Sequence, residues 1–340
     1  MTCRERPLSG CSADRLDSVV RASGFTGVVV VRHAGAIVFQ EAYGYATPRW
    51  QVPNTVDMRF DTASITKLFT SVAVLQQVGL DRLDLDASIH RYIDLSGTTI
   101  SRAVTLRHLL THTSGIADDA DEVAGEVYAD LFVDRPCYGI METADFLPQF
   151  AHKPALVEPG VQARYCNVSY VLAGLALEKV VGESYRSYVT REIFERAGMT
   201  GAGFFDRRDA VPRVAEGWDL VDGTWRSNIF SYPPIGSPDG GAHASAMDLL
   251  IFLDAVRSGQ LLTPKLTKEF LTPQVASDEQ VSFGFGLEFR RSTLYKEGSN
   301  AGVSALLARY GNADVDAVVL SNVDGAAWPV MAELNRRFES

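Results

Sequence analysis

Segments with the pattern of β-strands lie at both ends of the chain, and most of the helical patterns lie between them. Near the start, residues 25–31 and 36–42 are apolar runs on either side of a glycine turn at Gly35, which predicts a hairpin. Near the end, strand patterns cover 281–289, 292–297, 303–310 and 314–321. This distribution predicts an antiparallel sheet built from both ends of the chain and flanked by helices, which is an α/β (α+β) fold.

Segments with apolar residues at helical spacing occur mainly in the middle of the chain, and long polar or Gly/Pro-rich loops separate them. They cover residues 14–23, 105–111, 143–150, 168–181, 184–197, 245–258 and 326–338, and the main loops are 45–60, 112–140 and 200–240. The 340 residues exceed what one compact core usually serves. We therefore expect a discontinuous sheet lobe of residues 1–70 and 265–340, an inserted mainly helical lobe of residues 71–264, and a site between them.

The composition disfavours several classes of partner. Hydrophobic residues make up 46% of the chain, charged residues 22%, and the net charge is -10. Because no run is rich in Lys and Arg, neither nucleic acid nor an anionic membrane is expected as a partner. No apolar run approaches the length of a transmembrane span. The oligomeric state is not predicted.

The N-terminal residues and the cysteines bear on the compartment. Residues 8–11 have the look of a lipoprotein cleavage box ending at Cys11, but the preceding residues are not apolar, so no signal peptide is visible and we expect a cytoplasmic protein. The four cysteines have no paired spacing, so free thiols are expected in preference to a zinc site or disulfides. They are Cys3, Cys11, Cys137 and Cys166.

The tetrapeptide Ser64-Ile65-Thr66-Lys67 lies directly before a helical apolar pattern that ends at Gly79. Residues three apart share one face of a helix, so Lys67 is expected beside the Ser64 hydroxyl in the first turn. A serine hydroxyl needs such a neighbouring base to act as a nucleophile at neutral pH, and the helix dipole favours the alkoxide. In isolation, however, an accidental surface pair is the favoured interpretation of this common spacing.

An acyl-transfer site also needs an acid for the leaving group and donors for the oxyanion. Tyr165 is predicted on a loop between the turn at 158–160 and a helix that begins near Val168, where it is placed to shuttle a proton. Asn167 is predicted to hold Lys67 or a substrate amide by hydrogen bonds. The alternative for Tyr165 is a purely structural place in the core.

The segment Lys296-Glu297-Gly298-Ser299 ends the predicted strand 292–297. A glycine on an edge strand lets a substrate backbone approach closely. The backbone N–H of Ser299 is predicted to form an oxyanion hole with that of Ser64. The alternative for Lys296 is a solvated charge that blunts the strand edge.

The order Ser-x-x-Lys, Tyr-x-Asn, Lys-x-Gly resembles the serine β-lactamase and DD-peptidase superfamily, and the tyrosine of the second motif resembles its class C β-lactamase branch. Residues 105–115, Glu158-Pro159-Gly160, and Gly240-Gly241 before a Ser-Ala-x-Asp-Leu helix are similar to segments of that branch. The resemblance spans roughly residues 25–325. It implies the β-lactamase/transpeptidase-like fold.

The resemblance also implies roles for individual residues. Ser64 would be the acylated nucleophile, Lys67 its base or base partner, and Tyr165 the proton relay for acylation and for the deacylating water. Lys296 would polarise Tyr165 or bind a substrate carboxylate. Glu297 departs from the usual threonine or serine: its carboxylate neutralises Lys296 or repels anionic substrates, or strand alternation points it away from the site. Good β-lactam turnover is therefore not expected.

Other motifs are interpreted as structural. His108 and His112 have the spacing of some metal ligands but lack an accompanying glutamate, so no metal site is expected. Tyr310-Gly311-Asn312 repeats the Tyr-x-Asn pattern but falls in a hairpin turn. The Gly-x-Ser-x-Gly motif of α/β-hydrolases is absent. A solvated, mobile loop that borders the cleft at most is expected from four acidic residues: Asp118, Asp119, Asp121 and Glu122.

These expectations combine into a serine hydrolase that takes a small ester or amide, forms an acyl-enzyme on Ser64 and uses no cofactor. A class-C-like esterase or amidase is the first hypothesis. The alternatives are an acyltransferase that passes the acyl group to an amine or alcohol, and a true β-lactamase or D-amino-acid peptidase acting on a lactam or peptide. A non-enzymatic alternative is a penicillin-binding sensor that stays acylated.

Overall fold

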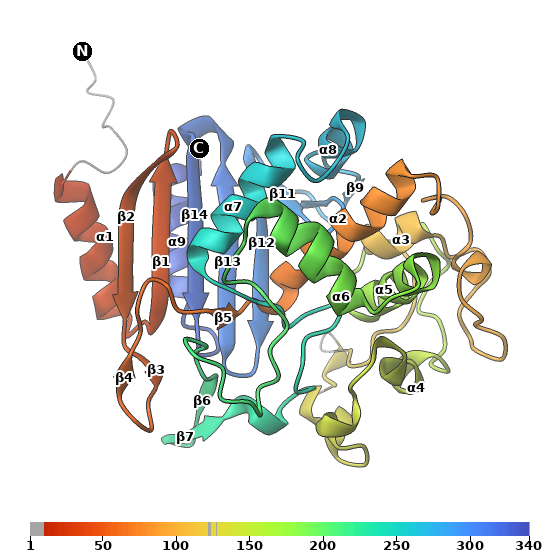
Figure 1. Ribbon diagram of the computed structural model, residues 1–340, viewed down its shortest axis with the longest axis horizontal. Helices are drawn as coiled ribbons and strands as arrows, with labels where there is room; N and C mark the ends of the chain where they lie inside the picture. Colours follow the sequence, from red (N-terminus) through yellow and green to blue (C-terminus); the bar gives the residue numbers. More distant parts are fainter. Residues whose placement is uncertain (1–9, 122–123, 127, 340) are drawn as a thin grey trace.

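The computed structural model describes residues 10–121, 124–126 and 128–339. The strands of its main sheet are β1 (Gly27–His33), β2 (Ala36–Tyr43), β9 (Val275–Ala276), β10 (Ser282–Phe283), β11 (Glu288–Arg290), β12 (Thr293–Asn300), β13 (Val303–Tyr310) and β14 (Val315–Ser321). Their order in the sheet is β2-β1-β14-β13-β12-β11-β10-β9, with every neighbouring pair antiparallel. Figure 1 shows the long strands of this sheet side by side. The predicted antiparallel sheet built from both ends of the chain is confirmed.

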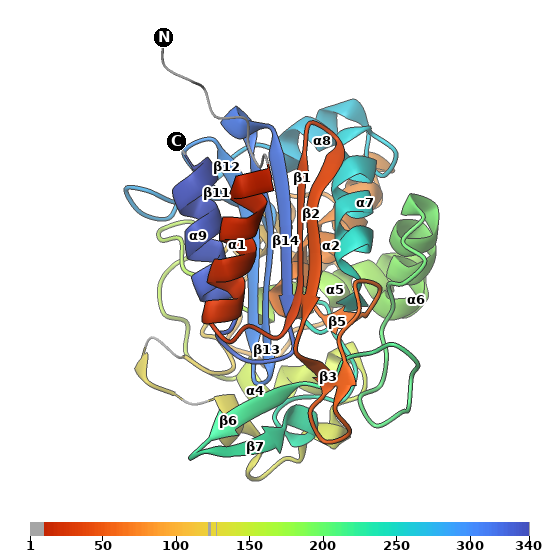
Figure 2. The ribbon, with the colours of Figure 1, turned by 90° about the vertical axis from the view of Figure 1, so that its left-hand side faces the viewer.

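Apolar side chains along β1 point alternately to the two faces of the sheet, so both faces need to be covered. Val29 and Val31 face a core formed with α1 (Gly10–Ala22) and α9 (Trp328–Phe338), which lie side by side on one face (Figure 2). Val28 and Val30 face the opposite core, which contains α2 (Thr66–Gly79) and α7 (Ala246–Arg257). The sheet is thus the middle layer of three.

The remaining helices except α8 (Pro264–Phe270) lie beyond α2 and form the mainly helical part of the molecule, whereas α8 packs against α2 at the top of the view (Figure 1). Those beyond α2 are α3 (Leu106–Leu110), α4 (Leu147–Phe150), α5 (Val168–Val181) and α6 (Tyr185–Val189). Single turns of 3-10 helix are η1 (Ala63–Ile65), η2 (Ile89–Arg91), η4 (Tyr128–Phe132), η5 (Cys137–Gly139), η6 (Thr143–Phe146), η8 (Asn228–Phe230) and η9 (Gly311–Ala313), and η7 (Thr190–Glu195) is a π-helix. The helix α5 packs across α2. The division into two lobes at the predicted boundaries stays a prediction.

Three small strand pairs lie outside the main sheet. They are β3 (Tyr45–Thr47) with β4 (Val52–Pro53), β5 (Phe60–Asp61) with β8 (His243–Ala244), and β6 (Trp218–Val221) with β7 (Thr224–Ser227). None of these three pairs was predicted, and neither was α8, because all of these elements are short and most lie in segments with many Gly, Pro and polar residues. The pair β5–β8 matters most, because the chain leaves β5 directly into the turn that carries Ser64.

Two composition-based expectations can be compared with the structure. Cys137 and Cys166 are buried free thiols, as expected; Cys3 lies outside the described residues, and nothing is described of the Cys11 side chain. In the described part of the chain, no helix has both the length and the apolar character needed to span a bilayer.

Candidate active site

Ser64 lies in η1, the 3-10 turn that leads into α2. We expected it in the first turn of an α-helix. The helix instead begins at Thr66, because Ala63 adopts a left-handed backbone with φ of +43°, which an α-helix does not allow. The turn still places the side chains of Ser64 and Lys67 together, as the spacing predicted.

Asp61, at the end of β5, holds the backbone of this turn. Its Oδ1 accepts the Ala63 N–H at 2.7 Å, while Oδ2 accepts the Tyr232 hydroxyl at 2.8 Å and pairs with Arg207. Burial by itself raises the pKa of Asp61, but the charge of Arg207 and the hydrogen bonds from Arg207 and Ala63 together outweigh it, and the net shift is downward. A buried ion pair therefore stabilises the left-handed residue that precedes Ser64.

Lys67 is completely buried, and its Nζ donates to three oxygen atoms. These are Ser64 Oγ at 3.0 Å, Asn167 Oδ1 at 2.8 Å and the backbone oxygen of Asp239 at 2.6 Å. Three acceptors match the three N–H groups of an ammonium ion. The interpretation of Ser64 and Lys67 as an accidental surface pair is wrong.

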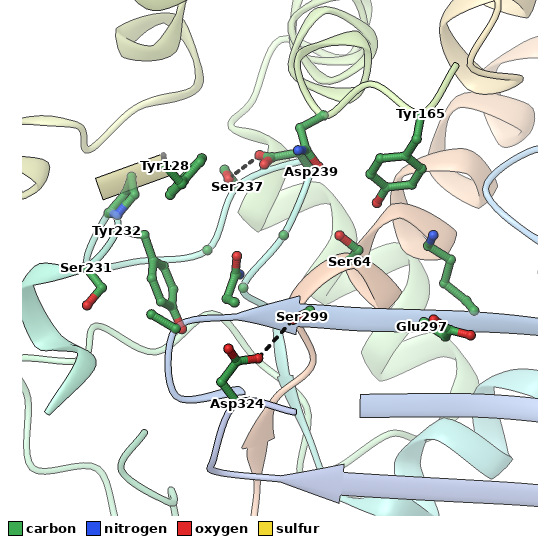
Figure 3. Close-up of a pocket in the computed structure, with 18 of the residues that line it drawn as sticks. Ser64, Tyr128, Tyr165, Ser231, Tyr232, Ser237, Asp239, Glu297, Ser299 and Asp324 are labelled. Carbon is green, nitrogen blue, oxygen red and sulfur yellow. Dashed lines mark hydrogen bonds between the residues drawn. The ribbon is translucent and has the colours of Figure 1, made fainter. Parts of the chain in front are cut away.

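Tyr165 lies on the loop before α5, half-buried at the cavity wall. Its ring centroid is 5.1 Å from Lys67 Nζ and 4.5 Å from Lys296 Nζ. Figure 3 shows the phenol oxygen directed toward Ser64. Both lysine charges are close enough to stabilise negative charge that develops on this oxygen.

His112 fixes the Tyr165 loop, a role that the sequence did not reveal. Its ring stacks on Tyr165 with centroids 4.4 Å apart, and its Nδ1 accepts the backbone N–H of Cys166 at 3.1 Å. Burial, together with the charges of Lys296 and Lys67, lowers the pKa of His112 well below its usual value, so the ring is neutral. In the part of the chain that is described, no group of His, Cys, Asp and Glu could hold a metal ion.

Asp118 is part of the site and not of a solvated loop. Its Oδ2 accepts the Asn167 N–H at 2.8 Å and its Oδ1 the Val168 N–H at 3.0 Å, so it orients the residue whose side chain accepts from Lys67. Asp119 is 2% exposed, and burial followed by repulsion from Asp118 raises its pKa. The expectation of a solvated, mobile acidic loop is wrong for these two residues, because backbone N–H groups draw them inward; Glu122 lies outside the described residues.

Lys296 is also buried, with 2% of its side chain exposed, so it is not a solvated edge charge. Its Nζ lies 2.6 Å from Glu288 Oε1 on the neighbouring strand β11. Burial lowers the pKa of Lys296, but the charge and hydrogen bond of Glu288, together with Tyr165 and Tyr170, outweigh it and raise the pKa above the usual range. The carboxylate that neutralises Lys296 is thus Glu288 and not Glu297.

Glu297 follows the alternation of β12. Tyr295, two residues earlier, packs in the core with α9, so strand alternation directs Glu297 to the face opposite Lys296, and Glu297 is still among the residues that line the cavity. Burial and the charge of Glu288 raise the pKa of Glu297, and the charges of Lys296 and Arg290 offset part of this rise.

Gly298 lets β12 lie directly against η1. A Cβ atom at this position would be 2.4 Å from the Thr62 carbonyl oxygen and 3.2 Å from the Ser64 nitrogen. Only glycine fits, and the next residue, Ser299, lines the cavity beside Ser64. The side chain of Ser299 donates to Asp324 at 3.2 Å.

These groups surround one cavity of about 460 Å³. All seven predicted site residues belong to it or contact a residue that does: Ser64, Tyr165, Asn167, Lys296 and Ser299 line it, Lys67 bonds to Ser64, and Gly298 packs under Ser64. Four supporting residues were not assigned to the site from the sequence: Asp61, His112, Asp118 and Glu288. Their roles depend on burial and on contacts between distant segments.

Comparisons with known proteins agree with this geometry. Residues 14–338 match the family model described as Beta-lactamase. The esterase EstB of Burkholderia gladioli is 31% identical over 288 residues, covering 74% of this chain and 72% of that protein. The crystal structure of a penicillin binding protein from Bacillus halodurans has a TM-score of 0.91 at 32% identity, covering 95% of this chain and 100% of that one. EstCE1, described as a hydrolase with promiscuous acyltransferase activity, shares the fold with a TM-score of 0.78 at 20% identity, covering 97% and 100%.

Proposed function

The chain belongs to the beta-lactamase family, whose members include serine hydrolases, and from this premise we propose that it hydrolyses a small ester or amide through an acyl-enzyme on Ser64. The observation that carries the proposal is the contact of Ser64 Oγ with Lys67 Nζ at 3.0 Å, in a cavity into which Tyr165 also points (Figure 3). A nucleophile, a cation and a proton relay converge there on the same space.

In the acylation step, Ser64 Oγ attacks the substrate carbonyl carbon. Its proton moves to the Tyr165 oxygen as the phenol proton passes to the leaving oxygen or nitrogen, so that Tyr165 ends the step as it began. Because the three N–H groups of Lys67 already have acceptors, we assign Lys67 to charge stabilisation and orientation of Ser64, and the proton transfer to Tyr165.

The negative charge on the carbonyl oxygen needs donors that are already in place. The backbone N–H groups of Ser64 and Ser299 are the proposed pair, since Gly298 brings β12 against the Ser64 backbone. Deacylation repeats the steps with water in place of the serine. Tyr165 then takes the water proton and returns a proton to Ser64 Oγ.

The pairing of Lys296 with Glu288 supports an esterase or amidase over a β-lactamase or D-amino-acid peptidase. A lysine that is free in the cavity would attract a substrate carboxylate, whereas this one is neutralised within the chain. Lys296 instead acts on Tyr165, whose ring it approaches to 4.5 Å.

The two free thiols, Cys137 and Cys166, support a cytoplasmic location, since reducing compartments keep thiols unpaired. We propose this compartment as the place of action. Cell fractionation followed by immunodetection tests it, and recovery of the protein in an exported fraction would contradict it.

The proposed reaction is tested with 4-nitrophenyl esters, anilides and nitrocefin, on the wild-type protein and the Ser64→Ala variant. We expect ester or anilide hydrolysis that exceeds nitrocefin turnover and falls by at least about 10³-fold in the variant. Ser64-independent hydrolysis would contradict the proposal. Amine acceptors are then added: a product that shifts to the new amide identifies an acyltransferase, and a stable Ser64 adduct without turnover identifies a sensor.

A further inference from the structure

Six charged side chains line the cavity, and both of its cations are already engaged within the chain. These six are Arg207, Asp239, Glu288, Lys296, Glu297 and Asp324. Lys296 pairs with Glu288 at 2.6 Å, and Arg207 pairs with the buried Asp61. Neither cation is available to an anionic substrate without breaking a buried pair.

Two of the carboxylates, in contrast, have only hydroxyl partners. Asp239 Oδ1 accepts from Ser237 at 2.5 Å, and Asp324 Oδ1 accepts from Ser299 at 3.2 Å. Within the described residues, no Lys, Arg or His nitrogen comes within 4.0 Å of either carboxylate. In the described part of the chain, neither carboxylate therefore has a direct cation partner, and Lys67 reaches only the backbone oxygen of Asp239, at 2.6 Å.

These two carboxylates occupy a definite part of the cavity. Figure 3 shows Asp239 and Asp324 on opposite sides of it, with Tyr128 and Tyr232 beyond them, and with Tyr165 on the other side of Ser64. We call the part lined by Asp239, Asp324, Tyr128 and Tyr232 the far end. If the leaving group takes its proton from Tyr165, the acyl chain bonded to Ser64 must extend toward the far end.

We propose that this cavity selects substrates by charge: it favours acyl groups that carry a cation, such as an ammonium, and disfavours carboxylates on the leaving group. This inference rests on the proposed function and adds the substrate class. A cation in the far end gains attraction from Asp239 and Asp324 and from the aromatic ring of Tyr128, whereas the Tyr232 ring already carries the Arg207 guanidinium at 3.7 Å from its centroid. A carboxylate near Tyr165 finds Lys296 already neutralised by Glu288.

The acyl-group preference is tested with three 4-nitrophenyl esters of the same shape. Their acyl groups are 4-(trimethylammonio)butanoyl, 5,5-dimethylhexanoyl and 4-sulfobutanoyl, which end in a cation, a neutral tert-butyl group and an anion. We expect the order cation, neutral, anion in kcat/KM, with at least about tenfold between the first two at low salt and a smaller ratio at high salt. A neutral or anionic ester used as well as the cationic one would overturn the proposal.

Two variants test whether the far end is the cause. Asp239→Asn and Asp324→Asn should each lower the cation-to-neutral ratio by about threefold or more. The matched control is Glu279→Gln, which removes the same charge from the exposed turn between β9 and β10 and should keep the ratio. A ratio unchanged in both aspartate variants would overturn the assignment. Because the readout is a ratio, a general loss of activity does not affect it.

The leaving-group preference is tested with hexanoyl esters of 3-hydroxybenzoate and of its methyl ester. Glu288→Gln frees Lys296 and should raise the carboxylate-to-neutral ratio about tenfold, whereas Glu288→Asp keeps the charge and should retain the wild-type ratio. An unchanged ratio in a Glu288→Gln variant with a wild-type circular dichroism spectrum would overturn this part.

The charge proposal and the proposed function are contradicted by different results. Ser64-dependent hydrolysis of the neutral ester without any charge preference would overturn the charge proposal and leave the proposed function standing. If no ester in the series is hydrolysed in a Ser64-dependent manner, the proposed function fails and the charge proposal fails with it.

Discussion

The two ends of the cavity treat charge in opposite ways. Around Lys67, Tyr165 and Lys296, which we call the catalytic end, each lysine is neutralised or fully hydrogen-bonded by the chain itself. At the far end, Asp239 and Asp324 have only serine hydroxyls as partners. The difference indicates that contacts within the chain fix the geometry of the reacting groups. At the far end, a cation of the substrate would pair with the two aspartates.

Burying the charged groups near the catalytic end costs free energy, and the ion pairs and hydrogen bonds of the supporting residues offset this cost. Burying an ion is expensive unless it is paired and hydrogen-bonded, and the catalytic end lies against two such ion pairs, Lys296 with Glu288 and Arg207 with Asp61. His112 and Asp118 then orient the Tyr165 loop. Rigid positioning of this kind is what an acyl-transfer site needs, because small displacements of the reacting groups are costly.

The largest effect is expected when the proton relay of the catalytic end is removed. Tyr165→Phe keeps the ring stacked on His112 but has no oxygen, so kcat/KM should fall by about 10²- to 10⁴-fold in an ester assay. The matched control is Tyr310→Phe. Tyr310 belongs to the other Tyr-x-Asn sequence, and its hydroxyl donates to Asn335 at 2.7 Å, away from the cavity. Near-normal activity of Tyr165→Phe would mean that another group moves the proton.

The next effect is on stability. Asp61→Asn leaves Arg207 buried without its partner and should lower the free energy of unfolding by roughly 3 kcal/mol or more, measured by urea denaturation. Because the pKa of Asp61 is lowered on folding, its contribution is present above the unfolded value of 3.8 and is lost as pH falls through the folded value, so the variant should lose less stability in acid.

The control for this stability effect is Asp57→Asn, which breaks the exposed Asp57–Arg213 pair. It should cost less than about 1 kcal/mol. Equal effects of the two substitutions would show that the Asp61 pair has no special role under Ser64.

A smaller effect is expected from His112. His112→Phe retains a ring to stack on Tyr165 but cannot accept the Cys166 N–H, and kcat should fall about tenfold with little change in KM. His112→Asn provides an acceptor and tolerates the left-handed backbone with φ of +59°, so it should recover part of this loss. Wild-type kcat in both variants would remove His112 from the positioning role.

The smallest effect is expected at Glu297, which projects from the face of β12 opposite Lys296. Glu297→Gln should change kcat/KM and the cation-to-neutral ratio by less than about threefold. A tenfold change in the ratio would show that the Glu297 carboxylate acts on the bound substrate, contrary to its predicted orientation.

Features of the fold that depend on local pattern were predictable from the sequence. The β-branched run in β1 and the apolar strands β13 and β14 predicted a sheet built from both ends of the chain. In the structure β1 pairs with β14, as this prediction requires. The order of Ser64, Tyr165 and Lys296 in three motifs was enough to indicate one site. These three residues are far apart in the sequence, and the fold that the family resemblance implied brings them together.

What the sequence did not reveal are polar residues whose role depends on burial. Asp118 was expected in solvent because acidic runs usually are, yet it bonds to the first N–H groups of α5. Glu288 lies on a short strand with little periodicity, and Asp61 precedes a left-handed residue that no pattern predicts. Charge pairing across distant segments becomes visible only when the segments are placed in space.

The most direct measurement of the central claim is the mass of the protein during turnover of an ester. The reaction is quenched with acid within the first turnovers, and intact mass and peptide masses are recorded for the wild type and for Ser64→Ala. We predict one added acyl group on the peptide that contains Ser64, and none in the variant. An acyl group on a different residue, or continued turnover by Ser64→Ala, would contradict acyl transfer through Ser64.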